Sequence, residues 1–187
     1  TFIAPNIGLR GSTFNGVNNF QCNGTAGATS YGGNVFNGIS SFSSTNTGYW
    51  YLANIQSEDF NANTTFTQSG SGLLRPVYTA DCTFSGNITT NTAIITFGSN
   101  GGRLILDGAS NQLINGNTSP IWRKARLLNT SGGITQNTPT ITVVLDMDFQ
   151  QGIISIPSGN MLIFNDNALA TGMTNLSFAD GQDRKSV

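Results

Sequence analysis

Histidine is absent from this chain, and charged residues of both signs are scarce. Only 9% of its 187 residues are charged, the formal net charge is −1, and Lys and Arg together number 8. The absence of His excludes His-based catalytic triads, the usual zinc sites and the commonest general base at neutral pH. We expect no nucleic-acid partner, because so few basic residues leave little to bind a phosphate backbone.

Long apolar runs and good helix formers are also rare. No apolar run approaches the roughly 20 residues of a membrane-spanning helix, so we expect no membrane span. Hydrophobic residues make up only 37% of the chain, and Gly, Asn, Thr and Ser are abundant in their place. This composition favours short strands and turns. The composition therefore predicts an ordered all-β chain. Because the chain begins at Thr1 without an initiator Met or a charged leader, we expect a fragment of a larger protein.

A short motif built on Phe recurs four times in the first half of the chain. Its phenylalanines occupy positions 14, 36, 60 and 84, at intervals of 22, 24 and 24 residues, and a second Phe follows six residues later in three copies. The repeated residues are Phe14, Asn15, Gly16, Phe36, Asn37, Gly38, Phe60, Asn61, Phe84 and Gly86. A fixed period in the low twenties indicates stacked repeats, each forming one coil of a solenoid.

The residue types of this motif explain how such coils would stack. A Phe at a fixed place in every coil can pack on the Phe above and below, which gives a dry aromatic column. Asn and Gly tolerate the left-handed backbone region and so allow a sharp corner after the inward aromatic. Asn15, Asn37 and Asn61 would lie one strand spacing apart, where their amides can hydrogen-bond in a ladder. We predict a parallel β-solenoid (a right-handed β-helix, as is usual for parallel crossovers) with coils of about 22–24 residues.

The chain divides by repeat type into residues 1–98, which hold the four motif copies, and residues 99–187, which keep the composition but lose the motif. We expect residues 99–187 to continue the solenoid, with a β-sandwich as the alternative. Residues 140–149 alternate between apolar and polar and predict a strand with one buried side, Val144 being the exception. The predicted buried set is Ile141, Val143, Leu145, Met147 and Phe149.

A second group of motifs lies in the last third of the chain. It comprises Leu127-Leu128-Asn129-Thr130-Ser131-Gly132-Gly133-Ile134-Thr135, then Gln151-Gly152-Ile153-Ile154, then Ser177-Phe178-Ala179-Asp180-Gly181 with Arg184-Lys185. Together with the Phe-Asn-Gly units and the segment of residues 48–54, this group resembles the repeat regions of very large surface and secreted proteins of Bacteroidetes bacteria. The resemblance implies export through the system that serves gliding and adhesion proteins, an extracellular or cell-surface location, and a role as a stalk or adhesive surface. The partners it implies are neighbouring repeats of the same protein, surface glycans or other copies in a filament.

The two cysteines, Cys22 and Cys82, lie at different phases of the repeat and more than two coils apart. At a rise of about 4.8 Å per coil, they are separated by roughly 10 Å or more along the axis, which is beyond the reach of a disulfide. We therefore predict two free, buried thiols.

Carboxylates are the only acid–base candidates that remain. Asp146 and Asp148 share one strand face, where they could hold Ca²⁺ with carbonyl oxygens or act as a glycosidase pair in a groove with Arg126. Outward carboxylates on a strand also commonly serve only solubility and edge protection. Glu58 and Asp59 are interpreted as a solvated corner. We predict no enzyme activity, no cofactor and no resident metal, and Asp146 and Asp148 are the metal candidates.

Aromatic residues offer the other candidate site. Tyr49, Trp50 and Tyr51 form the densest aromatic patch and are the candidate ligand-binding residues. In an extended segment, Tyr49 and Tyr51 lie on one face and Trp50 on the other. The face that continues the Phe columns packs in the core, and the opposite face is free to stack on a sugar ring.

The basic residues are also clustered. Arg123, Lys124 and Arg126 lie within one short segment, where alternation puts Arg123 on one face and the other two on the opposite face. We predict that this segment decorates a solvated edge, where charge resists edge-to-edge pairing.

The favoured function is a structural and interaction module: a rigid rod that spaces or displays adhesive parts of a large secreted or cell-surface protein. The alternative is a polysaccharide-binding or polysaccharide-processing β-helix. An ice-binding face would need threonines in register on successive coils. The Thr-x-Thr pairs that begin at Thr45, Thr65 and Thr90 start 9, 5 and 6 residues after their motif Phe, which argues against such a face.

Overall fold

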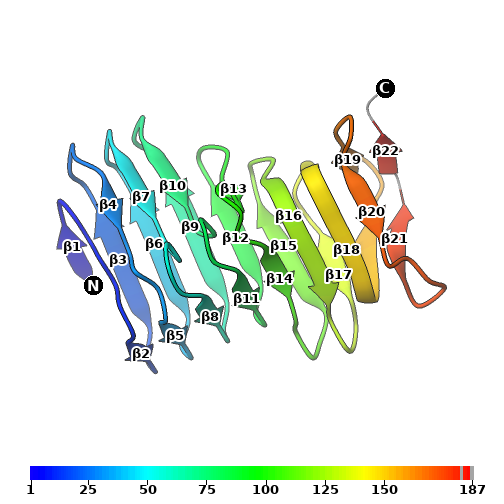
Figure 1. The fold of residues 1–187 in the computed structure, drawn as a ribbon, viewed down its shortest axis with the longest axis horizontal. Coiled ribbons are helices and arrows are strands. Elements are labelled where there is room, and N and C mark those ends of the chain that lie inside the picture. Colours follow the sequence, from blue (N-terminus) through cyan, green and yellow to red (C-terminus); the bar gives the residue numbers. More distant parts are fainter. Residues whose placement is uncertain (182, 186–187) are drawn as a thin grey trace.

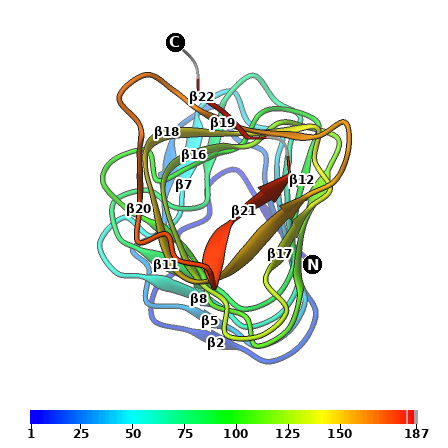
Figure 2. The same cartoon turned by 90° about the vertical axis from the view of Figure 1, so that its right-hand side faces the viewer.

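The chain winds into a β-solenoid of about 8 turns, built from stacked parallel strands without a helix in the described residues. The computed structural model describes residues 1–181 and 183–185. Figure 1 shows the strands stacked along the long axis in chain order, and Figure 2, a view down this axis, shows the coils superimposed as a ring. The predicted all-β parallel solenoid is confirmed. The strands after residue 99 also pair in parallel, so the β-sandwich alternative was wrong.

Each coil has three sides, and strands on one side pair in parallel with those of neighbouring coils, except that on side 3 the pairing is interrupted between β10 and β13. Side 1 consists of β2 (Thr13–Phe14), β5 (Val35–Phe36), β8 (Glu58–Phe60), β11 (Cys82–Phe84), β14 (Leu104–Leu106), β16 (Ile121–Leu128), β18 (Thr140–Ile156) and β20 (Leu169–Thr171). Side 2 consists of β1 (Phe2–Ala4), β3 (Asn18–Cys22), β6 (Ser40–Ser44), β9 (Thr64–Gln68), β12 (Ile88–Asn91), β15 (Gln112–Gly116), β17 (Ile134–Gln136), the end of β18, and β21 (Ser177–Gly181). Side 3 consists of β4 (Ala28–Thr29), β7 (Tyr49–Tyr51), β10 (Leu73–Arg75), β13 (Thr96–Phe97), the first residues of β16 and β18, β19 (Met161–Phe164) and β22 (Asp183–Lys185).

The motif phenylalanines form two columns inside the solenoid, as predicted. The first column consists of Phe14, Phe36, Phe60 and Phe84, and the second consists of Phe20, Phe42 and Phe66. Ring centroids are 5.0, 4.8 and 4.4 Å apart along the first column and 5.2 and 5.5 Å apart along the second. The two columns meet edge to face. This packing keeps successive coils in register, because each ring contacts rings both above and beside it.

The Asn ladder at the corner after side 1 is also confirmed. The side-chain amide of Asn37 donates to Asn15 Oδ1 and that of Asn61 donates to Asn37 Oδ1, both at 2.8 Å. The reason predicted for the adjacent glycine was wrong, because Gly38 does not have a positive φ. A Cβ on Gly38 would lie 1.9 Å from the carbonyl oxygen of Gly16 in the preceding coil. Glycine is therefore needed for close approach between coils.

Coils in the second half have a similar length, but two of them carry Leu in place of the motif Phe. Strand pairing places Leu106, Leu127 and Phe149 in line with Phe84, at successive intervals of 22, 21 and 22 residues. All three side chains are buried. The coil length is thus kept while the aromatic signal is lost, which is why no fixed repeat is visible in this part of the sequence.

One corner of β18 carries a β-bulge. The register between β16 and β18 shifts between Trp122 and Lys124, so three outward residues of β18 lie opposite two of β16. The alternation of inward and outward side chains is interrupted there: Val144, Leu145 and Asp146 all point outward between the buried residues Val143 and Met147. Leu145 is therefore 39% exposed, and its predicted place in the buried set was wrong. The other four members of that set are buried.

Cys22 and Cys82 are free and buried, as predicted. Cys82 lies directly beside Glu58 in the neighbouring coil, inside side 1. Nowhere in residues 1–181 and 183–185 is there a helix long and apolar enough to cross a membrane.

Candidate functional site

The carboxylates of Asp146 and Asp148 lie together on the outer face of side 1, but both are bound by arginines. Arg103 Nη2 is 2.9 Å from Asp146 Oδ1, and Arg103 Nη1 is 3.4 Å from Asp148 Oδ2. Arg126 Nε donates to Asp148 Oδ2 at 2.8 Å, and the side-chain amide of Gln150 donates to the same oxygen at 3.0 Å. The structure thus brings together three predicted residues and adds Arg103. Oxygens held by guanidinium groups are poor ligands for Ca²⁺, so this cluster does not resemble a calcium site.

The cluster joins three successive coils instead. Arg103 precedes β14, Arg126 belongs to β16, and the two aspartates belong to β18. Their side chains are 15–31% exposed, so solvent screens the pairs and the contribution of each to stability is modest, about 1 kcal/mol or less. Among the residues that the structure describes, no group of three or more His, Cys, Asp or Glu side chains could hold a metal ion.

The predicted position of the basic segment was wrong. β16 is an internal strand, paired with β13 and β14 on one side and β18 on the other, and so does not form an edge. Arg123 and Lys124 both lie between the inward residues Trp122 and Ala125, at the corner between sides 3 and 1. They point outward together because the chain turns this corner between them.

The predicted aromatic patch is divided by the alternation of β7. Trp50 is completely buried, so it cannot contact a ligand, and its candidacy was wrong. Tyr49 and Tyr51 lie outward and stack at 4.4 Å between ring centroids, and Tyr78 of the next coil stacks on Tyr51 at 4.1 Å. Both faces of the Tyr51 ring are therefore covered. A sugar would meet the edges and hydroxyl groups of this tyrosine stack (Tyr49, Tyr51 and Tyr78).

Glu58 is a functional candidate that the sequence analysis misplaced. Its carboxyl group is completely buried, whereas a solvated corner was predicted. It accepts hydrogen bonds from the backbone N–H of Asn34 at 2.9 Å and from the Asn34 side-chain amide at 2.9 and 3.0 Å. Burial raises the pKa of Glu58 to about 7, although the hydrogen bonds from Asn34 and Ala53 oppose the shift. A proton can thus bind inside the solenoid near neutral pH.

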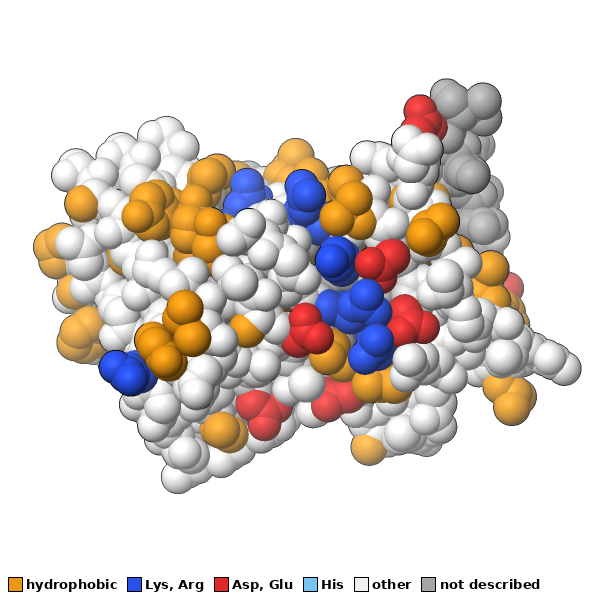
Figure 3. Space-filling view, in the orientation of Figure 1, with side chains coloured by type: hydrophobic (Ala, Val, Ile, Leu, Met, Phe, Trp, Pro, Cys, Tyr) orange, Lys and Arg blue, Asp and Glu red, His pale blue; other side chains and the backbone are white. Residues whose placement is uncertain are grey.

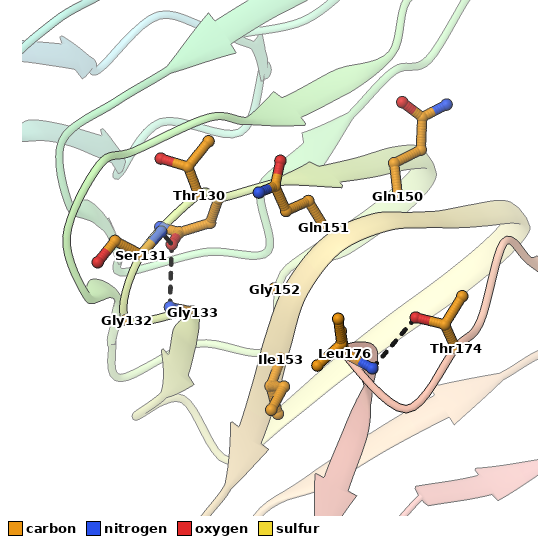
Figure 4. A pocket seen from close by; sticks show the side chains of 11 residues that line it. Thr130, Ser131, Gly132, Gly133, Gln150, Gln151, Gly152, Ile153, Thr174 and Leu176 are labelled. Atoms are coloured by element: carbon orange, nitrogen blue, oxygen red, sulfur yellow. Dashed lines mark hydrogen bonds between the residues drawn. The ribbon is translucent and has the colours of Figure 1, made fainter.

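A polar cavity of about 630 Å³ lies near the C-terminal end of the solenoid. The residues around it come from the corner after β16, from the middle of β18 and from the segment after β20 (Figure 4). Asn129 Oδ1 is already bound by the backbone N–H groups of Ser131 and Gly133. The lining contains no ionisable side chain, and most of it comes from residues 127–135 and 151–154, two segments of the second motif group.

Side 2 is free of charge along most of the solenoid. Its strands β3, β6, β9, β12, β15 and β17 contain no Asp, Glu, Lys or Arg. Thr65 is in register with Ser41 and Thr89, which makes a column of outward hydroxyl groups. The three Thr-x-Thr pairs do not share this face, because Thr90 is buried and Thr45 follows the end of β6. Charged residues are therefore concentrated on sides 1 and 3.

Comparison of this chain with known protein families, curated proteins and solved structures finds no significant match.

Proposed function

We propose that this chain is a rigid spacer module of a large secreted or cell-surface protein, in which it holds adhesive parts away from the cell. One observation carries the proposal: a continuous column of inward side chains runs from Phe14 to Phe149 through in-register coils. In a solenoid, each coil contacts only its neighbours, so coils add length without changing the cross-section. This property suits a stalk.

The surface chemistry favours the spacer role rather than a role in polysaccharide cleavage. Most glycosidases need one carboxyl group that can protonate the leaving oxygen and a second carboxylate that acts as a base or a nucleophile. Asp146 and Asp148 are instead joined to Arg103 and Arg126. Glu58, the carboxyl group with a raised pKa, is sealed inside the coils.

Single-molecule pulling between the two termini tests the mechanical role. A spacer should resist extension and then lengthen in steps of one or a few coils, each coil holding about 22 residues. Continuous extension at low force, without steps, would contradict the proposal.

The cell-surface location needs a separate test. An antibody raised against the purified chain should label intact cells that produce the parent protein. Labelling that appears only after the cells are permeabilised would contradict the proposed location.

A further inference from the structure

Three basic side chains near the corner between sides 3 and 1 lack an acidic partner. Arg75 lies at the end of β10, and Arg123 and Lys124 lie in β16. The ion pairs within the described part of the chain involve only Arg103 and Arg126 as cations, so these three residues form none. Lys124 is in register with Asp146, but the ion pair of Asp146 is with Arg103. The absence of a partner is notable because Arg75 is only partly exposed. A partly desolvated guanidinium without an acceptor is unfavourable, and an anion that bound there would offset this cost.

The backbone brings Arg75 and Arg123 to the same surface. Val77, two residues after Arg75, accepts a hydrogen bond from the N–H of Gly98 in the next coil. A Cβ placed on Gly98 would lie 3.6 Å from the Cβ of Arg123, one coil further on. Because Gly98 has no side chain, it does not cover Arg123 from the intervening coil. Two coil steps separate the backbones of Arg75 and Arg123 by about 10 Å along the axis.

The electrostatic surroundings agree with this placement. Burial lowers the pKa of Arg75 and the charge of Arg123 lowers it further, whereas the nearby Tyr51 and Tyr78 oppose the shift. The tyrosine stack adjoins Arg75, since Tyr51 is in register with it and Tyr78 is three residues further along the chain. In Figure 3, the Lys and Arg side chains on the upper part of the face lie next to hydrophobic side chains, whereas those in the middle also border Asp and Glu side chains. The surface thus combines unpaired cations with phenolic hydroxyl groups.

We propose that Arg75, Arg123 and Lys124, with the tyrosine stack beside them, form a binding surface for an acidic polysaccharide. Its carboxylate or sulfate groups would pair with the guanidinium and ammonium groups, and its hydroxyl groups would hydrogen-bond with the exposed edges of the tyrosines. A polymer that carries charges along its length can reach both Arg75 and the consecutive residues Arg123 and Lys124, which lie two coils further on. This inference does not depend on the spacer role, and it gives the rod a ligand.

Binding of polysaccharides that differ in their charged groups tests the proposal. The probes are dextran sulfate, polygalacturonate and unmodified dextran, each titrated into the full chain by calorimetry at low and physiological salt. Dextran sulfate or polygalacturonate should bind, with an affinity that falls as salt rises, and dextran should not. The two charged probes distinguish sulfate from carboxylate recognition. Absence of binding by both would overturn the proposal.

Variants that remove cations inside and outside the proposed surface locate the site. Arg75→Gln with Arg123→Gln should lower the affinity at least tenfold. Arg10→Gln, the control, removes a cation that lies over the ring of Tyr31, 4.2 Å from its centroid, and should change the affinity less than twofold. Lys124→Gln serves as a milder variant if the double variant does not fold, and should weaken binding on its own. An equal loss in the Arg10 control would overturn the assignment.

A thymidine oligonucleotide separates polysaccharide binding from general attraction of polyanions. It carries phosphate charges without the hydroxyl-rich pyranose rings that the tyrosines are proposed to contact. It should bind at least tenfold more weakly than the better acidic polysaccharide. Equal affinity would show a non-selective anion surface and would contradict the proposal.

Discussion

Glu58 is a carboxyl group enclosed between coils whose interior is otherwise largely apolar. Its partners are the backbone and side chain of Asn34 and the backbone of Ala53. Because the chain contains no His, few other groups titrate between pH 5 and 7. The stability of the protein in this range should therefore report mainly on Glu58.

The free energy of unfolding should fall as the pH rises from about 4.5 to about 7. The folded chain holds the Glu58 proton with a pKa of about 7, against an ordinary value of 4.5, so the folded state binds more protons within this window. The stabilisation is fully present below the lower pKa and is lost as the pH passes the higher one. The difference between pH 4.5 and 8 should be about 3 kcal/mol at most. Denaturant titrations at several pH values measure it.

Glu58→Gln is the control for this pH effect. Glutamine keeps the shape of the side chain but has no proton equilibrium, so the stability of the variant should change little over the same window. If the wild-type chain and the variant show the same pH slope, Glu58 is not the responsible group.

Asp146→Asn and Asp148→Asn should lower the free energy of unfolding by different amounts. Asp146 contacts one arginine through a partly exposed pair, so its substitution should lower the free energy of unfolding by about 1 kcal/mol or less. Asp148 Oδ2 contacts Arg103, Arg126 and Gln150, so its substitution should cost more. Thermal unfolding of both variants ranks them, and the reverse order would contradict the described network.

The inward position of Glu58 could have been predicted from the repeat. Ser12, Asn34, Glu58 and Cys82 each stand two residues before the motif Phe, and strand alternation puts such residues on the same face as that Phe. Its charge alone led to the interpretation as a solvated corner. The repeat position was the stronger signal, because it also applies to the buried residues Asn34 and Cys82.

At the scale of the elements, close contact between successive corners fixes the coil spacing. Gly38→Ala should destabilise the chain by about 1–3 kcal/mol, because the added methyl group would lie 1.9 Å from the carbonyl oxygen of Gly16. Gly16→Ala is the matched control, since no atom lies within 4 Å of its added methyl group. Denaturant unfolding compares the two. A harmless Gly38→Ala would mean that the coils are not packed this closely.

The element boundaries in residues 1–98 follow from the motif, but those after residue 99 do not. Leu106 and Leu127 fill the place of the motif Phe, and an aliphatic residue at that spacing is not distinctive in sequence. The ion pairs between β14, β16 and β18 depend on this hidden register, so Arg103 was not identified as a partner of Asp146. The bulge that exposes Leu145 is likewise set by pairing with β16.

At the scale of the whole molecule, stability is a property of neighbouring coils. Phe60 stacks on Phe36 and Phe84 and meets Phe42 and Phe66 edge to face, so it joins three coils. Phe60→Ala should lower the free energy of unfolding by about 3–5 kcal/mol. Since each coil is held mainly by its neighbours, the loss of stability should be confined to the coils around Phe60.

Hydrogen exchange on Phe60→Ala, followed peptide by peptide against the wild-type chain, tests the stacked-coil account most directly. The account predicts that amides of β5, β8 and β11 lose protection, while those of β16 and β18 keep it. Unchanged protection around Phe60, or an equal loss over the whole chain, would contradict the account.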